Sequence, residues 1–247
     1  MPRQTTLLAN QEIYHIVLRA VGDSIVFKDE KDYYRGIFSI YEFNNFDSVS
    51  IRDRREQRKK EKLELLKVPR SPTSGNLNGL VDMDKRKKMV EILAFCFMPN
   101  HIHLLARQLK DNGISQFMQK VGGGYANYSN KKYNRKGHLF SQFRAIHIKT
   151  DEQLYTVFVY IHANCISLIE PGWKENGIKN PEKVIKFLNN FKWSSYPDYI
   201  GKTNFLSVTE REFMLKVMGN QQGCREALES WVKYKKRFKD FGDIVLE

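Results

Sequence analysis

The 247-residue chain carries 41 Lys and Arg against 28 Asp and Glu, a formal net charge of +13 at pH 7, and 41% of its residues are hydrophobic. This hydrophobic content excludes a globally disordered chain, and the positive charge favours nucleic acid as the partner over a membrane surface. The three cysteines lie far apart without a C-x-x-C pair, which excludes a disulfide framework and a zinc finger. With neither a signal-peptide pattern nor an apolar run of membrane-spanning length, we expect a cytoplasmic protein.

The first predicted elements are a strand over residues 14–21 (YHIVLRAV) and a helix over residues 31–44, where apolar residues recur at helical spacing. The composition then changes, because residues 52–62 (RDRREQRKKEK) are nearly all charged and residues 69–78 are rich in Pro, Ser, Gly and Asn. We therefore expect an inserted, mobile or loosely helical segment over residues 45–82. It would either contact nucleic acid or serve as a solvated linker.

A buried strand is predicted over residues 90–98 (VEILAFCFM), followed by a turn at Pro99 and Asn100 and a second strand that begins at His101. Residues i and i+2 of a strand point to the same side, so His101 and His103 should present two imidazoles on one face. Two neutral imidazoles can bind one divalent metal ion. The alternative is a pair of ordinary histidines that form hydrogen bonds with the backbone or with water.

An amphipathic helix is predicted from residue 113 to 132, but a run of three glycines, residues 122–124, would cost about 2–3 kcal/mol of helix propensity. The glycines could instead form a hinge or allow a phosphate to approach the backbone. The following residues 125–135 (YANYSNKKYNR) alternate aromatic, amide and cationic side chains, as in grooves that bind single-stranded nucleic acid. The residues predicted to contact DNA here are Tyr125, Tyr128, Lys131, Lys132 and Arg135.

A turn and a further strand are predicted over residues 137–149 (GHLFSQFRAIHIK), and Arg144 within it is a candidate phosphate contact or an ordinary surface cation. The helix predicted over residues 151–168, capped by Thr150 or Asp151, is the second half of the candidate site.

Tyr160 and Asn164 are four residues apart on this helix, so their side chains emerge on the same side, one turn apart. A phenol and an amide oxygen presented together suit metal-dependent cleavage of a phosphodiester. The alternative is a partly buried tyrosine whose hydroxyl bonds locally. His162 points away from Tyr160 around the helix, and we expect it to be structural or to face DNA.

Four ordered blocks, together spanning about residues 12–200, resemble the REP-associated tyrosine transposases, a branch of the single-tyrosine HUH nuclease/transposase superfamily. They are FCFMPNHIHLL (95–105), GHLFSQFR (137–144), YIHAN (160–164) and WSSY (193–196). The chain departs from that pattern at Cys165, where a proline is usual, and in the glycine run. The second departure puts the shape of the nearby DNA surface in question.

The resemblance implies an α+β fold, with a ferredoxin-like antiparallel sheet and helices on one face. The transposase domain would span residues 1–200, with the basic insertion at about 45–82, and residues 201–247 would form a C-terminal helical accessory segment. That segment contains helices predicted to begin at Thr209 and to span residues 222–239.

The resemblance further implies that His101, His103 and Asn164 bind Mg²⁺ or Mn²⁺ and that Tyr160 is the nucleophile, forming a 5′-phosphotyrosine with DNA. The implied partner is single-stranded or hairpin DNA of the REP type, bound by a monomer or homodimer in the cytoplasm at the nucleoid. An inert DNA- or RNA-binding protein on the same scaffold remains an alternative. A zinc hydrolase of small substrates is disfavoured, because the chain has no H-E-x-x-H motif.

Overall fold

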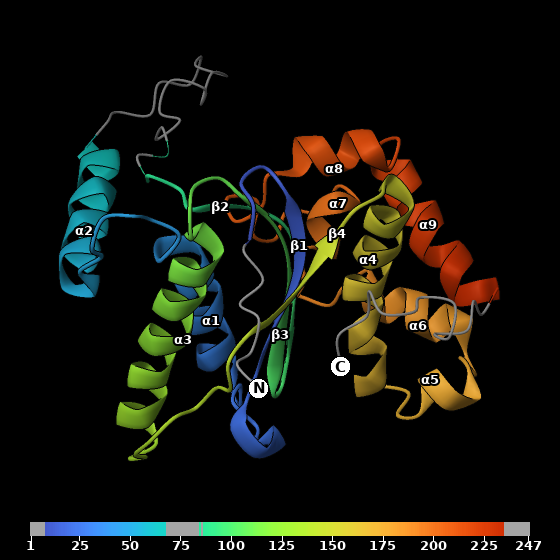
Figure 1. Cartoon of the computed structure of the whole chain (residues 1–247), viewed down its shortest axis with the longest axis horizontal. Helices are drawn as coiled ribbons and strands as arrows, with labels where there is room; N and C mark the ends of the chain where they lie inside the picture. Colours follow the sequence, from blue (N-terminus) through green and yellow to red (C-terminus); the bar gives the residue numbers. More distant parts are fainter. Residues whose placement is uncertain (1–7, 68–83, 85, 235–247) are drawn as a thin grey trace.

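A four-stranded antiparallel sheet, in the strand order β2-β3-β1-β4, forms the centre of the computed structural model (Figure 1). The structure describes residues 8–67, 84 and 86–234. The strands are β1 (Ile13–Arg19), β2 (Val90–Met98), β3 (His101–Gln108) and β4 (Arg144–Ile148). This order confirms the predicted α+β class and the ferredoxin-like sheet.

Helices α1 (Glu30–Glu42) and α3 (Gly113–Lys132) cover one face of the sheet. They pack on the aromatic and aliphatic side chains that alternate toward that face, among them Phe95 and Phe97 of β2 and Ile102 of β3. The sequence argument against a continuous helix through residues 122–124 was wrong, because α3 is unbroken there. Its buried apolar stripe offsets the weak helix propensity of the glycines; the stripe comprises Ile114, Phe117, Met118, Val121 and Tyr125.

Helix α4 (Asp151–Ala163) lies on the opposite face, so the expectation of helices on one face only was wrong. A 3₁₀ helix (Asn164–Leu168) continues α4, where a longer α-helix was predicted. Five further helices follow within residues 169–234, and residues from each of them belong to the core on this face. They are α5 (Trp173–Asn176), α6 (Pro181–Leu188), α7 (Tyr196–Tyr199), α8 (Arg211–Val217) and α9 (Gln221–Tyr234).

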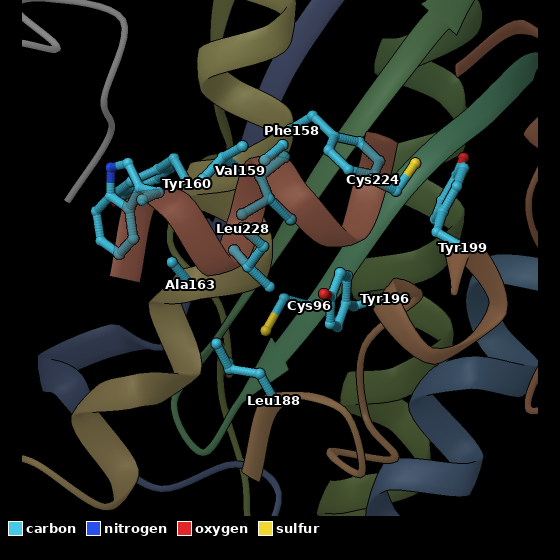
Figure 2. Packing of buried hydrophobic residues seen from close by; sticks show 14 of the residues in the cluster. Cys96, Phe158, Val159, Tyr160, Ala163, Leu188, Tyr196, Tyr199, Cys224 and Leu228 are labelled. Atoms are coloured by element: carbon cyan, nitrogen blue, oxygen red, sulfur yellow. The ribbon is translucent and has the colours of Figure 1, made fainter. Parts of the chain in front are cut away.

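The C-terminal helices share the core of α4 and the sheet. Figure 2 shows Cys224 and Leu228 of α9 in one cluster with Cys96 of β2 and Phe158 of α4. Described residues beyond 200 therefore stabilise the face of the sheet that carries the histidines. Residues 235–239 of the last predicted helix lie outside the described residues.

The predicted insertion contains helix α2 (Ile51–Lys67), a charged helix at the edge of the molecule (Figure 1). Its Arg54 pairs with buried Glu42 of α1 at 3.0 Å, and residues 68–82 of the insertion lie outside the described residues. A short 3₁₀ helix, Val21–Asp23, follows β1. Within the part of the chain that the structure describes, no helix combines the length and apolar character needed to cross a membrane.

Candidate active site

Both predicted histidines lie on the face of β3 that α4 covers. In the sheet register, His101 is opposite Arg19 and His103 is opposite Val17 of β1. Opposite residues of an antiparallel pair share a face, so Arg19 stands beside the two imidazoles. The centroids of the two histidine rings lie 4.8 Å apart, with an angle of 79° between their planes. The strand periodicity that predicted this pair is confirmed.

Helix α4 brings Tyr160 and Asn164 onto the same histidines. The helix begins where predicted, because the Thr150 hydroxyl accepts a hydrogen bond from the Gln153 N–H at 3.2 Å. The Tyr160 ring stands edge-on to the His103 ring, with centroids 5.5 Å apart and an interplanar angle of 88°. One turn further, the Asn164 amide lies 2.9 Å from His103 Nε2. Residues from the two distant motifs therefore meet in one site.

His15 of β1 is a further member of this site that the sequence analysis missed. Its Nε2 lies 3.0 Å from His103 Nδ1, and the two rings stack with centroids 5.3 Å apart. The His15 ring also meets Tyr160 edge-on at 5.6 Å. A polar residue at position 15 within the apolar predicted strand was the available signal, but its value depended on knowing that β1 pairs with β3.

Burial and neighbouring charge keep these imidazoles neutral. Burial, followed by the positive charges of Arg19 and Lys174, lowers the pKa of His101 to about 3. The pKa of His103 is lowered well below its ordinary value, chiefly by burial and also by His101 and His15. Neutral imidazoles keep a nitrogen lone pair for a metal ion at pH 7.

The donor set fits a hard divalent cation. His101 Nδ1 lies 2.7 Å from Asn100 Oδ1, so a proton on Nδ1 leaves Nε2 available as a ligand. The Asn164 amide lies 2.9 Å from His103 Nε2. In an octahedral site with metal–ligand bonds of about 2.1 Å, neighbouring ligand atoms lie about 3 Å apart, so the observed distance suits two ligands of one ion. An amide can present its oxygen in the place of its nitrogen by turning over.

Among the residues that the structure describes, no group of three His, Cys, Asp or Glu side chains is arranged to hold one metal ion. The Asn164 amide, a residue type outside that set, lies 2.9 Å from His103 Nε2. Amide oxygens suit Mg²⁺ and Mn²⁺ better than softer metals.

The site is closed in this structure. The relative exposures of His101, His103, Tyr160 and Asn164 are 7%, 1%, 0% and 4%. Lys174 of α5 lies over the Tyr160 ring, with Nζ 6.0 Å from the ring centroid. The Tyr160 phenol is therefore covered by the surrounding structure.

The predicted DNA contacts divide into buried, paired and exposed residues. Tyr125 is buried, and its hydroxyl donates to the Val26 carbonyl oxygen at 3.3 Å, so the structure does not favour its stacking on a base. Tyr128 and Lys132 both bond to the buried Asp32, at 3.1 and 2.7 Å. Four residues of the predicted set are exposed, namely Lys131, Lys132, Arg135 and Arg144.

Arg144 lies on the histidine face of the sheet. It is opposite Val17 of β1, which is itself opposite His103 of β3. This register places a cation at the edge of the sheet on the face that carries the candidate site.

Of the two roles expected for His162, structural or facing DNA, the structure supports the structural one. It is buried, and its Nε2 lies 2.8 Å from the Ser195 hydroxyl. That hydroxyl also accepts a hydrogen bond from the Phe95 N–H at 2.9 Å. The WSSY block therefore links α4 to β2.

A family model described as "Transposase IS200 like" matches residues 67–164. The matched segment contains His101, His103, Tyr160 and Asn164, whereas His15 lies before it. Over this segment, the match confirms the resemblance to transposases indicated by the sequence blocks. No curated protein matches the chain.

Several solved structures are similar to the chain at low identity, among them the following three. One is described as a REP-associated tyrosine transposase bound to a REP hairpin, with 11% identity, a TM-score of 0.46 and coverage of 83% of this chain and 90% of that chain. A bacterial tRNA(His) guanylyltransferase-like protein with GTP has 10% identity, a TM-score of 0.38 and coverages of 68% and 72%. Its ATP complex has 9% identity, a TM-score of 0.35 and coverages of 74% and 69%. At these TM-scores, the likenesses establish no function for this chain.

Proposed function

Starting from the match of residues 67–164 to the IS200-like transposases, which supports a transposase-like role in DNA processing, we propose a specific activity for this chain. It is a metal-dependent endonuclease and strand transferase that acts on single-stranded or hairpin DNA through a tyrosine nucleophile. The net charge of +13 supports an anionic substrate of this kind.

One observation carries the proposal. Tyr160 and Asn164 of α4 both contact His103 of β3, the tyrosine through its ring at 5.5 Å between centroids and the asparagine at 2.9 Å. A nucleophile, an amide and two imidazoles in one place are the groups that cleavage of a phosphodiester through tyrosine requires.

In the proposed reaction, the Tyr160 phenolic oxygen attacks the phosphorus of the scissile phosphodiester. The new bond joins the tyrosine oxygen to phosphorus, and the bond between phosphorus and the 3′ oxygen breaks. The phenol loses its proton, and the leaving 3′ oxygen gains one to become a 3′ hydroxyl. Because the phosphotyrosine remains a phosphodiester, attack by another 3′ hydroxyl can rejoin DNA without ATP.

His101, His103 and the Asn164 amide oxygen would hold Mg²⁺ or Mn²⁺. When bound, such an ion would polarise the phosphate and stabilise the leaving oxygen. Asn100 would orient His101, because its Oδ1 lies 2.7 Å from His101 Nδ1. His15 would orient His103 in the same way, because its Nε2 lies 3.0 Å from His103 Nδ1. Arg19 and Lys174, whose charges reach both imidazoles, would attract the phosphate toward the site.

Formation of a covalent adduct tests the proposal. The protein is incubated with Mn²⁺ and a library of hairpin-bearing single-stranded DNA, and linked products are resolved on a denaturing gel and sequenced. Wild-type protein should form the adduct, and Tyr160→Phe should not, while binding DNA with nearly unchanged affinity. Tyr155→Phe is the matched control, because Tyr155 lies on the same helix but is 44% exposed.

An undiminished adduct in Tyr160→Phe would show that another residue is the nucleophile. DNA binding by the wild type without any adduct would instead indicate the inert binding protein. Omission of Mn²⁺, or His101→Ala, should abolish the adduct if the metal and its ligand are required.

A further inference from the structure

A groove of about 290 Å³ lies between α3 and the loop of residues 137–143, and the proposed chemistry does not use it. Its volume is close to the lower bound, about 300 Å³, of pockets that hold small ligands. Buried Leu18 and Met118 contribute apolar surface to it, and the partly exposed rings of Phe140 and Phe143 also line it.

The glycine run of α3 keeps this groove open. A side chain at Gly124 would collide with the ring of Phe43, so that glycine serves helix packing. Gly122 and Gly123 line the groove instead. A Cβ at Gly122 would come within 3.9 Å of Leu18, whereas a Cβ at Gly123 would have no heavy atom within 4 Å. A larger side chain at position 123 would therefore project into open space in the groove.

The chemistry of the groove walls suits a flat ring with polar edges. Phe140 and Phe143 offer aromatic faces, and the amides of Gln119 and Gln142 offer hydrogen-bond donors and acceptors. Phe140 is supported from behind by buried Tyr125, with ring centroids 5.8 Å apart. Proteins that bind single strands stack bases on such rings and bond the base edges with such polar groups.

The groove lies on the α3 face of the sheet, and the candidate active site lies on the opposite face. The two are connected through the end of β1 and the loop of residues 137–143. The N–H and hydroxyl of Ser141, a groove residue, both donate to the Arg19 carbonyl oxygen, at 2.9 and 3.0 Å. Arg19 is opposite His101 in the sheet. Three residues after Ser141, the chain reaches Arg144, which lies on the histidine face. The exposed cations Arg144 and Lys136 flank the loop and can bind the phosphates on either side of a base.

We propose that this groove binds one unpaired base of the single-stranded DNA whose backbone passes to the histidine site. This inference rests on the proposed function for the identity of the nucleic acid. It gives the glycine run a role in substrate recognition, because a side chain at position 123 would occupy the place of the base.

Equilibrium binding tests the groove separately from the chemistry. A fluorescent single-stranded oligonucleotide, selected as a binder from a random pool, is titrated with full-length Tyr160→Phe protein in EDTA. Adding Gly123→Leu should weaken binding by about 5- to 150-fold, the factor that corresponds to loss of one stacked base. The melting temperature should not fall, because leucine is a better helix former than glycine. Asn127→Leu is the control, since that exposed residue lies one turn further on α3 and does not line the groove.

An abasic scan of the same oligonucleotide identifies the bound base. At one position of the oligonucleotide, removal of the base should weaken binding to the Gly123 protein by about the factor that Gly123→Leu causes. Removal of the same base should not weaken binding to the Gly123→Leu protein any further. The proposal would be overturned if Gly123→Leu bound the oligonucleotide as tightly as the Gly123 protein, or if Asn127→Leu lost as much affinity. It would also be overturned if, at every abasic position, base removal weakened binding to the leucine variant by the same factor as binding to the Gly123 protein. None of these results depends on the adduct, so failure of the tyrosine chemistry is detected separately.

Discussion

The two faces of the sheet each bury a tyrosine beneath a helix, yet the two tyrosines have different surroundings. On the face covered by α1 and α3, the Tyr125 hydroxyl is bonded to a backbone carbonyl and its ring lies among other aromatic rings. On the α4 face, the Tyr160 ring meets the imidazoles of His15 and His103. Burial alone therefore does not distinguish a core tyrosine from a candidate nucleophile. The groups that face the ring distinguish them.

The polar groups of the two faces differ in the same way. Asp32 of α1 is buried, and burial alone would raise its pKa, but hydrogen bonds from Lys132 and Tyr133 outweigh burial and lower it. Its charge is thus matched within the fold. The histidines of the α4 face are instead held neutral next to cations, which leaves lone pairs for a ligand.

The largest expected effect is on stability and lies on the α1 and α3 face. Asp32 accepts hydrogen bonds from the Lys28 N–H, Tyr128, Tyr133 and Lys132, at distances of 2.9, 3.1, 2.6 and 2.7 Å. Asp32→Ala should lower the free energy of unfolding by about 3 kcal/mol, because it leaves several hydrogen-bond donors around a buried position without their acceptor. Urea denaturation measures this. Asp32→Asn, which retains an acceptor oxygen, should cost less; equal stability of wild type and Asp32→Ala would refute the structural role.

The next effect tests His15 as a positioning residue for the proposed metal site. His15→Phe keeps an aromatic ring but removes the nitrogen that contacts His103 Nδ1. Loss of such an orienting partner should weaken Mn²⁺ affinity by about 10- to 100-fold, measured by calorimetry on the apo protein.

His15→Gln is the control, since its amide can bond to His103 and should restore part of the Mn²⁺ affinity. Wild-type affinity in His15→Phe would show that His15 only fills space.

Acid should destabilise the protein through the histidines of the α4 face. Burial lowers the pKa of His162 to about 3, below its ordinary value of 6.5. The unfolded chain therefore binds a proton below pH 6.5 that the folded protein excludes, so the free energy of unfolding falls as the pH drops. From pH 8 to pH 5, His162 alone should contribute a loss of about 2 kcal/mol.

Urea denaturation at the two pH values measures this loss, and His162→Gln should reduce the difference. An unchanged pH dependence in that variant would mean that His162 is not the group that excludes the proton.

The smallest effect contrasts the two tyrosines directly. Tyr125→Phe should lower the free energy of unfolding by about 1 kcal/mol, because it removes the hydrogen bond to the Val26 carbonyl. It should leave DNA adduct formation intact, unlike Tyr160→Phe. Thermal denaturation and the adduct gel together provide the check, and loss of the adduct in Tyr125→Phe would contradict the division between the two faces.

Features that follow from local backbone periodicity could be predicted without the fold. His101 and His103 share a face because strand residues alternate, and Tyr160 and Asn164 share a side because an α-helix turns every 3.6 residues. The predicted strands and the Thr150 cap arose from equally local preferences.

Features that depend on contacts between distant residues became visible only in the folded chain. The pairing of β1 with β3 brought His15 to His103, and the packing of α4 on the second face brought Tyr160 to both. Tertiary packing also buries Tyr125, which the sequence pattern had predicted to contact DNA. The same packing stabilises α3 as a continuous helix across residues 122–124. Sheet register and helix packing are set by the summed burial of many side chains, so no short stretch of sequence contains them.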